Sequence, residues 1–98
     1  MRKYKRLSEV EGEGMYVIVH HPSGVVYPGM SSELDDRLYQ HEARLKTHTH
    51  ENRTLRVLSK LHGTEGFRVR VLSIPPSRAA FKRLHRRLRT RFLDLCIT

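Results

Sequence analysis

A short segment near the C-terminus carries the clearest chemical signal. SRAAFKRLHRRLRTR, residues 77–91, contains seven lysines and arginines and no acidic residue. Solvent-facing helix surfaces normally mix charges of both signs, and a surface of one sign repels itself unless a polyanion neutralises it. The segment therefore predicts a phosphate-binding surface, which gives affinity without sequence readout and a steep dependence on salt.

Other basic residues extend this predicted surface. FRVRVL, residues 67–72, alternates strictly, and the arm at the N-terminus adds Arg2, Lys3, Lys5 and Arg6. Few aromatic residues are free to stack on bases, which favours DNA duplex over single strands. An acidic protein partner and a homodimer stay open, whereas a membrane surface ranks last because the apolar stripe of residues 77–95 is needed for a core. The predicted nucleic-acid-binding residues are Arg68, Arg70, Arg78, Lys82, Arg83, Arg86, Arg87 and Arg89, with Arg91 beside them.

The whole chain limits the class of protein. It has 98 residues, a net charge of +9, 38% hydrophobic and 30% charged residues, which is the composition of one small globular domain and not of a disordered chain. Cys96 is the single cysteine, so no internal disulfide forms and a reducing compartment is expected. No apolar stretch has the length of a signal peptide core or a membrane span. We expect a soluble protein of the cytoplasm or nucleoid.

A second group of residues combines two tyrosines with an arginine and a histidine. Gly14-Met15-Tyr16 and Tyr27-Pro28-Gly29 place a glycine beside each tyrosine, at matching ends of two β-rich runs. Arg37 and His41 follow at i and i+4, so they point to the same side of a helix. Taken singly, the tyrosines fit a packed sheet and the other two a solvated helix. Only their joint placement indicates a site.

The elements that position these residues follow from periodicity. Residues 15–19 and 25–27 read as a hairpin closed by HHPSG, and Pro28 requires that its strand end or run along an edge. Serines at 31 and 32 fit a helix start, with Leu34, Leu38 and Leu45 on one face through residue 46. A second helix is predicted from about residue 52 to 61, with Leu55, Leu58 and Leu61 on one side and Gly63 as its C-terminal cap.

The remaining elements are a strand and a helix. Phe67, Val69 and Val71 are expected on the buried face of a strand that Pro75-Pro76 ends. The final helix is expected to start near Ser77, and its stripe is Phe81, Leu84, Leu88, Phe92 and Leu95. The fold class is therefore α+β in the order β-β-α-α-β-α, a three-stranded antiparallel sheet flanked by helices. Residues 1–13 are expected to form a basic, polar arm and residues 14–98 a single domain.

Over about residues 14 to 95 the sequence resembles the GIY-YIG nuclease family. Gly14-Met15-Tyr16 stands for GIY and Tyr27-Pro28-Gly29 for YIG, with Ser31, Ser32, Arg37 and His41 where the family has a polar cap, an arginine and a histidine. The resemblance implies that Tyr16, Tyr27, Arg37 and His41 are catalytic. One tyrosine would help activate water, Arg37 would neutralise the scissile phosphate, and His41 would relay a proton or hold a phosphate oxygen. Gly14 and Gly29 would let backbone and phosphate approach. Such domains often come from phages and mobile elements.

The sequence departs from the family in its last helix. The family has a metal-binding glutamate there, whereas no Asp or Glu lies between Glu65 and Asp94, and His85 stands near the expected place. Mg²⁺ prefers oxygen ligands, so histidine is a poor substitute. Asp35, Asp36 and Glu13 are alternative ligands, although acids in a first helical turn usually serve the helix dipole. His20, His21, His48 and His50 lack the spacing of a zinc site and read as polar loop residues.

Three functions remain open at this point. The first is a DNA-binding protein on a GIY-YIG-like domain whose cleavage is lost or strongly reduced, which needs no cofactor and acts by occupying or competing for DNA sites. The second is an active endonuclease that uses Mg²⁺ or Mn²⁺, with its glutamate substituted or unrecognised. The third is an interaction module that docks an acidic protein on the basic C-terminal helix. Cys96 is expected to be an ordinary packed residue.

Overall fold

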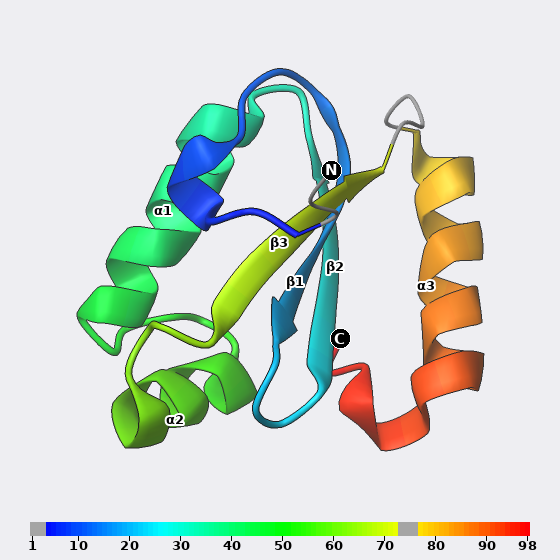
Figure 1. Cartoon of the computed structure of the whole chain (residues 1–98). Helices are drawn as coiled ribbons and strands as arrows, with labels where there is room; N and C mark the ends of the chain where they lie inside the picture. Colours follow the sequence, from blue (N-terminus) through cyan, green and yellow to red (C-terminus); the bar gives the residue numbers. More distant parts are fainter. Residues whose placement is uncertain (1–3, 73–76) are drawn as a thin grey trace.

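The computed structural model describes residues 4–72 and 77–98, and the expectations for Arg2, Lys3 and Pro75-Pro76 fall outside them. The chain forms a short 3-10 turn, η1 (Leu7–Glu9), and a hairpin of β1 (Gly14–His20) and β2 (Val25–Ser31). Two helices follow, α1 (Leu34–Lys46) and α2 (Arg53–His62), and then β3 (Phe67–Leu72). The chain ends with α3 (Arg78–Phe92) and a second 3-10 turn, η2 (Leu93–Leu95). The predicted α+β class and element order are confirmed (Figure 1).

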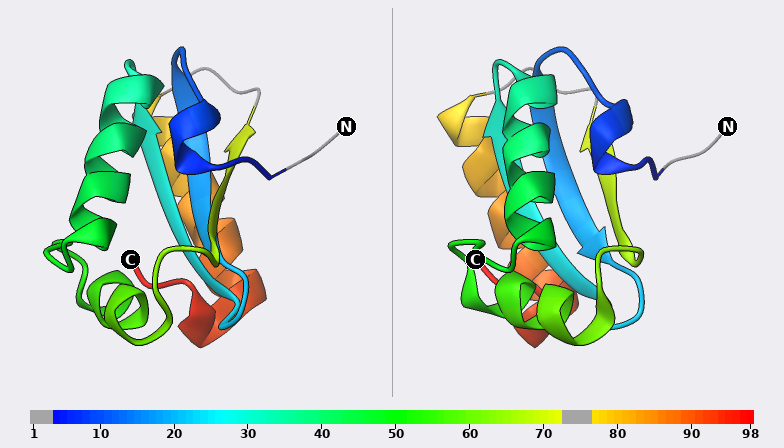
Figure 2. Two further views of the ribbon diagram at one scale, coloured as in Figure 1. Left: turned by 60° about the vertical axis from the view of Figure 1, so that its left-hand side comes forward. Right: turned by 90° about the vertical axis from the view of Figure 1, so that its left-hand side faces the viewer.

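The three strands form one antiparallel sheet in the order β2-β1-β3, so the apolar β1 lies in the centre. Helices α1 and α2 cover one face and α3 covers the other (Figure 2). Pro28 pairs with Val17 on the edge strand β2, as its missing N–H requires. The main core lies on the α1 side and includes Ile18, Leu34, Leu38, Leu45 and Leu55.

The N-terminal segment is not an arm in its described part. Leu7 and Val10 are buried in the main core, and Lys5 makes two backbone hydrogen bonds with Val69 on the outer edge of β3. The prediction of an arm was wrong for these residues because two apolar side chains in a polar stretch are enough to anchor it. Lys5 and Arg6 still expose their side chains.

Several helix predictions need correction. The serines do not cap α1, because Glu33 occupies the N-cap position and Ser31 Oγ instead accepts a hydrogen bond from the Glu33 N–H. On α2 the Gly63 cap is confirmed and Asn52 is the N-cap, but Leu61 is 71% exposed. It lies in the last turn of the helix, next to the C-terminal cap.

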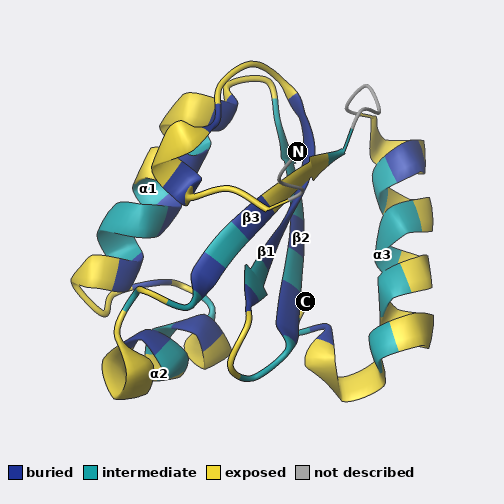
Figure 3. Cartoon of the chain, in the orientation of Figure 1, coloured by how far each residue is buried: buried dark blue, intermediate teal, exposed yellow. Residues whose placement is uncertain are grey.

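The outer ends of β3 and α3 are also more exposed than their periodicity predicts. Val71, near the end of the edge strand β3, is 37% exposed, and Leu95 is exposed as well. Helix α3 begins at the Ser77 cap as expected, yet Ala80 is its only buried residue among those described (Figure 3). Helix α3 packs on Val17 and Val26 through Leu84, Leu88 and Phe92, which form a second, smaller cluster and remain half-buried.

Candidate functional site

The first feature of the site is the contact between Tyr16 on β1 and Gly29 on β2. The two residues are direct partners in the antiparallel register. A Cβ at position 29 would lie 2.7 Å from Tyr16 Cε2 and nearer still to the ring end and hydroxyl, which real atoms do not tolerate. Glycine is therefore required at position 29 because the tyrosine ring fills the space above it. The structure thus explains the glycine by its contact with the Tyr16 ring and not by access for a phosphate.

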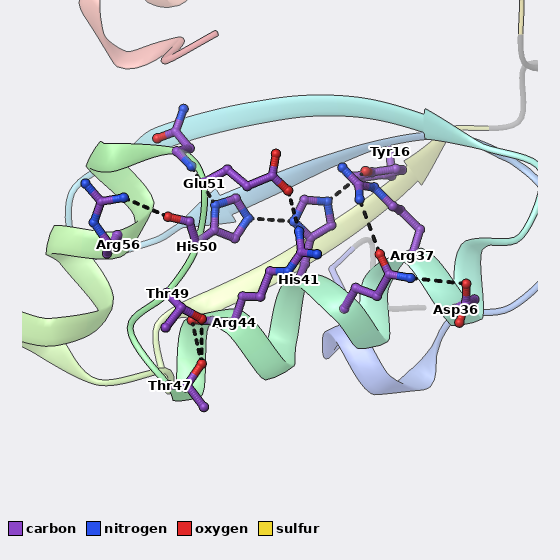
Figure 4. Close-up of polar contacts among 12 residues, drawn as sticks. Tyr16, Asp36, Arg37, His41, Arg44, Thr47, Thr49, His50, Glu51 and Arg56 are labelled. Atoms are coloured by element: carbon purple, nitrogen blue, oxygen red, sulfur yellow. Dashed lines mark hydrogen bonds and ion pairs between the residues drawn. The ribbon is translucent and has the colours of Figure 1, made fainter.

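Tyr16 begins a chain of three buried polar side chains (Figure 4). Its hydroxyl lies 2.9 Å from Nε2 of His41 on α1, and Nδ1 of His41 lies 2.7 Å from Nε2 of His50. The exposed fractions of Tyr16, His41 and His50 are 1%, 3% and 1%. His50 belongs to the loop between α1 and α2, so this chain joins the sheet, a helix and a loop.

The direction of the hydrogen bonds in this chain follows from its far end. The backbone N–H of Asn52 donates to His50 Nδ1 at 3.0 Å, so that nitrogen carries no proton. A neutral imidazole then holds its proton on Nε2, which makes His50 the donor to His41 Nδ1. His41 in turn carries its proton on Nε2 and donates to the Tyr16 oxygen. Both ring nitrogens of His41 are thus engaged, and neither is available to a phosphate oxygen in this arrangement.

The electrostatics keep both histidines neutral. Burial first, and then the nearby Arg37, His50 and Arg44, together lower the pKa of His41 to about 3. Burial also lowers the pKa of His50, although Glu51 opposes the shift. Burial raises the pKa of Tyr16, while Arg37 opposes that change. Tyr16, His41 and His50 are therefore all neutral near pH 7.

Tyr27 and Arg37 form the accessible rim of the site. The Tyr27 ring stands edge-on to the rings of His41 and His50, with centroids 5.5 and 5.8 Å apart. Both Tyr27 and Arg37 are half-buried, and Arg37 Nη1 lies 3.4 Å from Gln40 Oε1. Burial raises the pKa of Tyr27, and Arg37 opposes this shift. The four residues Tyr16, Tyr27, Arg37 and His41 are therefore close together, with Tyr27 and not Tyr16 facing outward.

His50 is the member of this cluster that the sequence reading missed. Its reading as a polar loop residue was wrong, because the side chain is buried against His41 and Tyr27. The other histidines are separate. His48 lies 3.3 Å from Ser59, and His20 is buried at the far end of β1 beside Phe67. The one local signal for His50 is the capping residue Asn52, which fixes where α2 begins and therefore where the loop turns inward.

Carboxylates are poorly placed to hold a metal ion at this site. Asp35, Asp36 and Glu13 are exposed, and the acid adjoining His50 is Glu51, which forms an ion pair with Arg44. Over residues 4–72 and 77–98, no three His, Cys, Asp or Glu side chains gather in a way that suits a metal. His85 lies on α3, across the sheet, with Nε2 2.7 Å from the Thr98 carbonyl oxygen. The described residues do not fit Mg²⁺ or Mn²⁺, which prefer several oxygen ligands.

The basic residues of α3 are exposed, as the sequence predicts. All seven lysines and arginines of α3 are exposed, and no ion pair within the described parts of the chain neutralises any of them. Arg70 is also exposed, whereas Arg68 is half-buried and its Nη1 donates to the carbonyl oxygens of Glu65 and Phe67. Arg68 thus has fewer free donors than the others. None of the helices described is long and apolar enough to span a membrane.

Comparison with known proteins identifies the fold. No protein-family model and no curated protein sequence matches the chain. Two solved structures do: the catalytic domain of the homing endonuclease I-TevI, with 18% identity, a TM-score of 0.71 and coverage of 87% of this chain and 95% of that one; and a glutamate-to-alanine variant of the same catalytic domain, with 22% identity, a TM-score of 0.65 and coverage of 80% and 81%. At this identity the likeness concerns the fold, and the chain has the fold of a GIY-YIG homing endonuclease catalytic domain.

Proposed function

We propose that this protein binds DNA duplex and that its cleavage activity is lost or strongly reduced. It would act by occupying DNA sites or by competing for them. The observation that carries the proposal is the row of seven exposed cations on α3, none of them in an ion pair with another described residue, on a domain with an endonuclease-like fold. Such a surface attracts phosphates before any specific contact forms.

The other half of the proposal rests on the missing oxygen donors. A metal-dependent nuclease uses its ion to generate the nucleophile and to stabilise charge. The position expected to supply the carboxylate holds His85, which instead contacts Thr98. With Glu51 paired to Arg44, the site has arginine and histidine side chains where a cation needs negative charge.

The polar cluster keeps a role in this proposal as a phosphate-binding site. Arg37 would hold a backbone phosphate at the rim, since its guanidinium suits phosphate oxygens. Tyr27 would donate a second hydrogen bond from the same rim. Tyr16, His41 and His50 would set the position of this rim from beneath, because their hydrogen bonds link β1 to α1 and to the loop.

An active endonuclease is the alternative that one observation favours. Tyr16, Tyr27, Arg37 and His41 lie together although they come from three elements, which is unusual for a cluster without a function. Nucleophile activation by Tyr27 would then need a metal carried by ligands outside those identified here. Docking of an acidic protein on α3 is the third possibility and has its own test below.

The deciding experiment measures binding and cleavage on one labelled duplex. Binding is followed by fluorescence anisotropy from about 50 to 200 mM salt, and products are separated after incubation with Mg²⁺, Mn²⁺ or EDTA. Variants are Arg37→Ala and Tyr27→Phe, with Tyr39→Phe as a matched control because Tyr39 is an exposed tyrosine on α1. The variant His85→Glu restores a carboxylate at the expected position.

We expect salt-sensitive binding without cutting, weaker binding in Arg37→Ala, and no change in Tyr39→Phe. Cutting that appears only in His85→Glu would show that the carboxylate is the missing part. Metal-dependent cutting by the unmodified chain, abolished in Tyr27→Phe, would overturn the loss of cleavage. Absence of duplex binding at the lowest salt would overturn the proposal altogether.

A further inference from the structure

An apolar groove lies between α3 and the sheet, on the face opposite Tyr16 and Tyr27. Its volume is about 490 Å³. Val17 and Val26 lie at its base and are only 7% and 5% exposed, whereas Val19 beside them is half-buried. The periodicity of α3 predicts a covered apolar stripe, yet Leu84, Leu88 and Phe92 are also only half-buried. The groove therefore offers an aliphatic surface that the protein itself leaves partly open.

The dimensions of the groove restrict what can enter. It runs along α3 from Ala80 to Phe92, which is three turns or about 18 Å. This length matches one row of apolar side chains along about three turns of a partner helix.

The charges along the groove are all positive. Arg83, Arg87 and Arg91 recur at every turn on the helix side, and Arg70 stands on the strand side. None of the described residues that line the groove is acidic. A ligand must therefore present apolar groups to the floor and negative charges on both flanks of that apolar row.

We infer that this groove binds an acidic amphipathic helix of another protein. Leucine-like side chains at i, i+4 and i+7 would enter the groove, and glutamates or aspartates beside them would meet Arg83, Arg87 and Arg70. A second copy of the chain is disfavoured by its charge of +9 and by the absence of acids from residue 66 to 93. Duplex DNA would leave the half-buried apolar side chains of the groove uncovered, so it suits the outer surface of α3, where Lys82, Arg86 and Arg89 lie.

The test compares two synthetic peptides of equal composition and charge. In one, leucines form a single stripe flanked by glutamates; in the other, the same residues are rearranged so that no stripe forms. Affinity for the full chain is measured by isothermal titration calorimetry. The matched variants are Arg87→Gln on the groove and Arg86→Gln, its neighbour outside the groove. A third variant, Leu88→Asp, places a carboxylate in the groove, and circular dichroism checks its folding.

We expect the striped peptide to bind and the rearranged peptide to fail. Arg87→Gln should weaken binding about three- to fivefold, Arg86→Gln should leave it unchanged, and Leu88→Asp should weaken it by about tenfold or more. If Leu88→Asp does not fold, the two arginine variants still decide the question.

Several results would overturn the inference. They are equal binding of both peptides, equal effects of the two arginine variants, and no binding of either peptide. If the unmodified protein binds duplex DNA but neither peptide, this inference is rejected and the proposed function stands.

Discussion

The imidazole rings of His41 and His50 lie nearly parallel, with an interplanar angle of 16° and centroids 5.0 Å apart, joined by a nitrogen–nitrogen hydrogen bond of 2.7 Å. Nδ1 of His50 accepts from the Asn52 N–H and Nδ1 of His41 accepts from His50, so neither ring can take up a second proton without losing a hydrogen bond. The pair therefore depends on both histidines being neutral. This makes the stability of the protein sensitive to mild acid.

Stability should fall as the pH drops below about 6.5, the pKa of an unfolded histidine. The pKa of His41 is about 3 in the folded chain, so between these values the unfolded chain binds a proton that the folded chain does not, and unfolding is favoured. For His41 the loss between pH 7 and pH 5 is about 2 kcal/mol. Urea denaturation at a series of pH values measures it.

The variant His41→Gln isolates this effect. It should be less stable at pH 7, because His50 loses its partner, but its stability should depend less on pH by about one proton. His21→Gln is the control, since His21 is exposed. An undiminished pH dependence in His41→Gln would mean that the loss of stability in acid originates elsewhere.

Replacing Gly29 should destabilise the hairpin. Gly29→Ala puts a methyl group into the Tyr16 ring, and forced repacking of this kind costs about 1 to 3 kcal/mol. Chemical denaturation gives the value. The double-mutant cycle with Tyr16→Ala is the control, because the alanine should cost little once the ring is gone. A full cost in the Tyr16→Ala background would locate the strain in the backbone.

The salt dependence of duplex binding should identify the outer arginines. Arg86→Gln should weaken binding to all sequences alike and reduce the slope of log affinity against log salt by about 1. Arg53→Gln on α2 is the matched control, as an exposed arginine away from α3. If both variants change the slope equally, duplex contacts are spread over the protein and α3 is not the binding helix.

Cys96 should resist thiol reagents while the protein is folded. Its side chain is buried in a cluster with Val17 and Val26, so a reagent reaches the sulfur only when this part of the structure opens. Labelling with a chromogenic disulfide should therefore be slow in buffer and fast in denaturant. Rapid labelling of the folded chain would indicate that residues 96–98 detach from the sheet.

The sequence was sufficient to predict the order of elements because each has a strong local signal. Alternation marks β3, the leucine spacing marks α1, and Asn52 and Gly63 bound α2. Errors occurred where burial depends on distant segments. Leu61 follows the same helical spacing as Leu55 and Leu58, so the sequence predicts that it is buried. Whether another segment covers it depends on the tertiary fold, and in the structure Leu61 is exposed.

The site was predicted unevenly for the same reason. Tyr16, Tyr27, Arg37 and His41 were singled out by their spacing together with a family resemblance, and their roles stay predictions. His50 was missed because its contact with His41 depends on how the loop after α1 folds back. Gly29 was singled out from the sequence, but the reason that glycine is required there was not. Gly29 contacts the Tyr16 ring only because the two residues pair across neighbouring strands.

The two ends of the chain also shield the sheet from self-association. A three-stranded sheet has two edge strands, and open edges invite pairing with other chains. Lys5 hydrogen-bonds to Val69 on one edge, and at the other Ile97 N–H donates to Val26, with Pro28 further along the same strand. Displacement of these contacts would therefore open both edges of the sheet to pairing with other chains and promote aggregation.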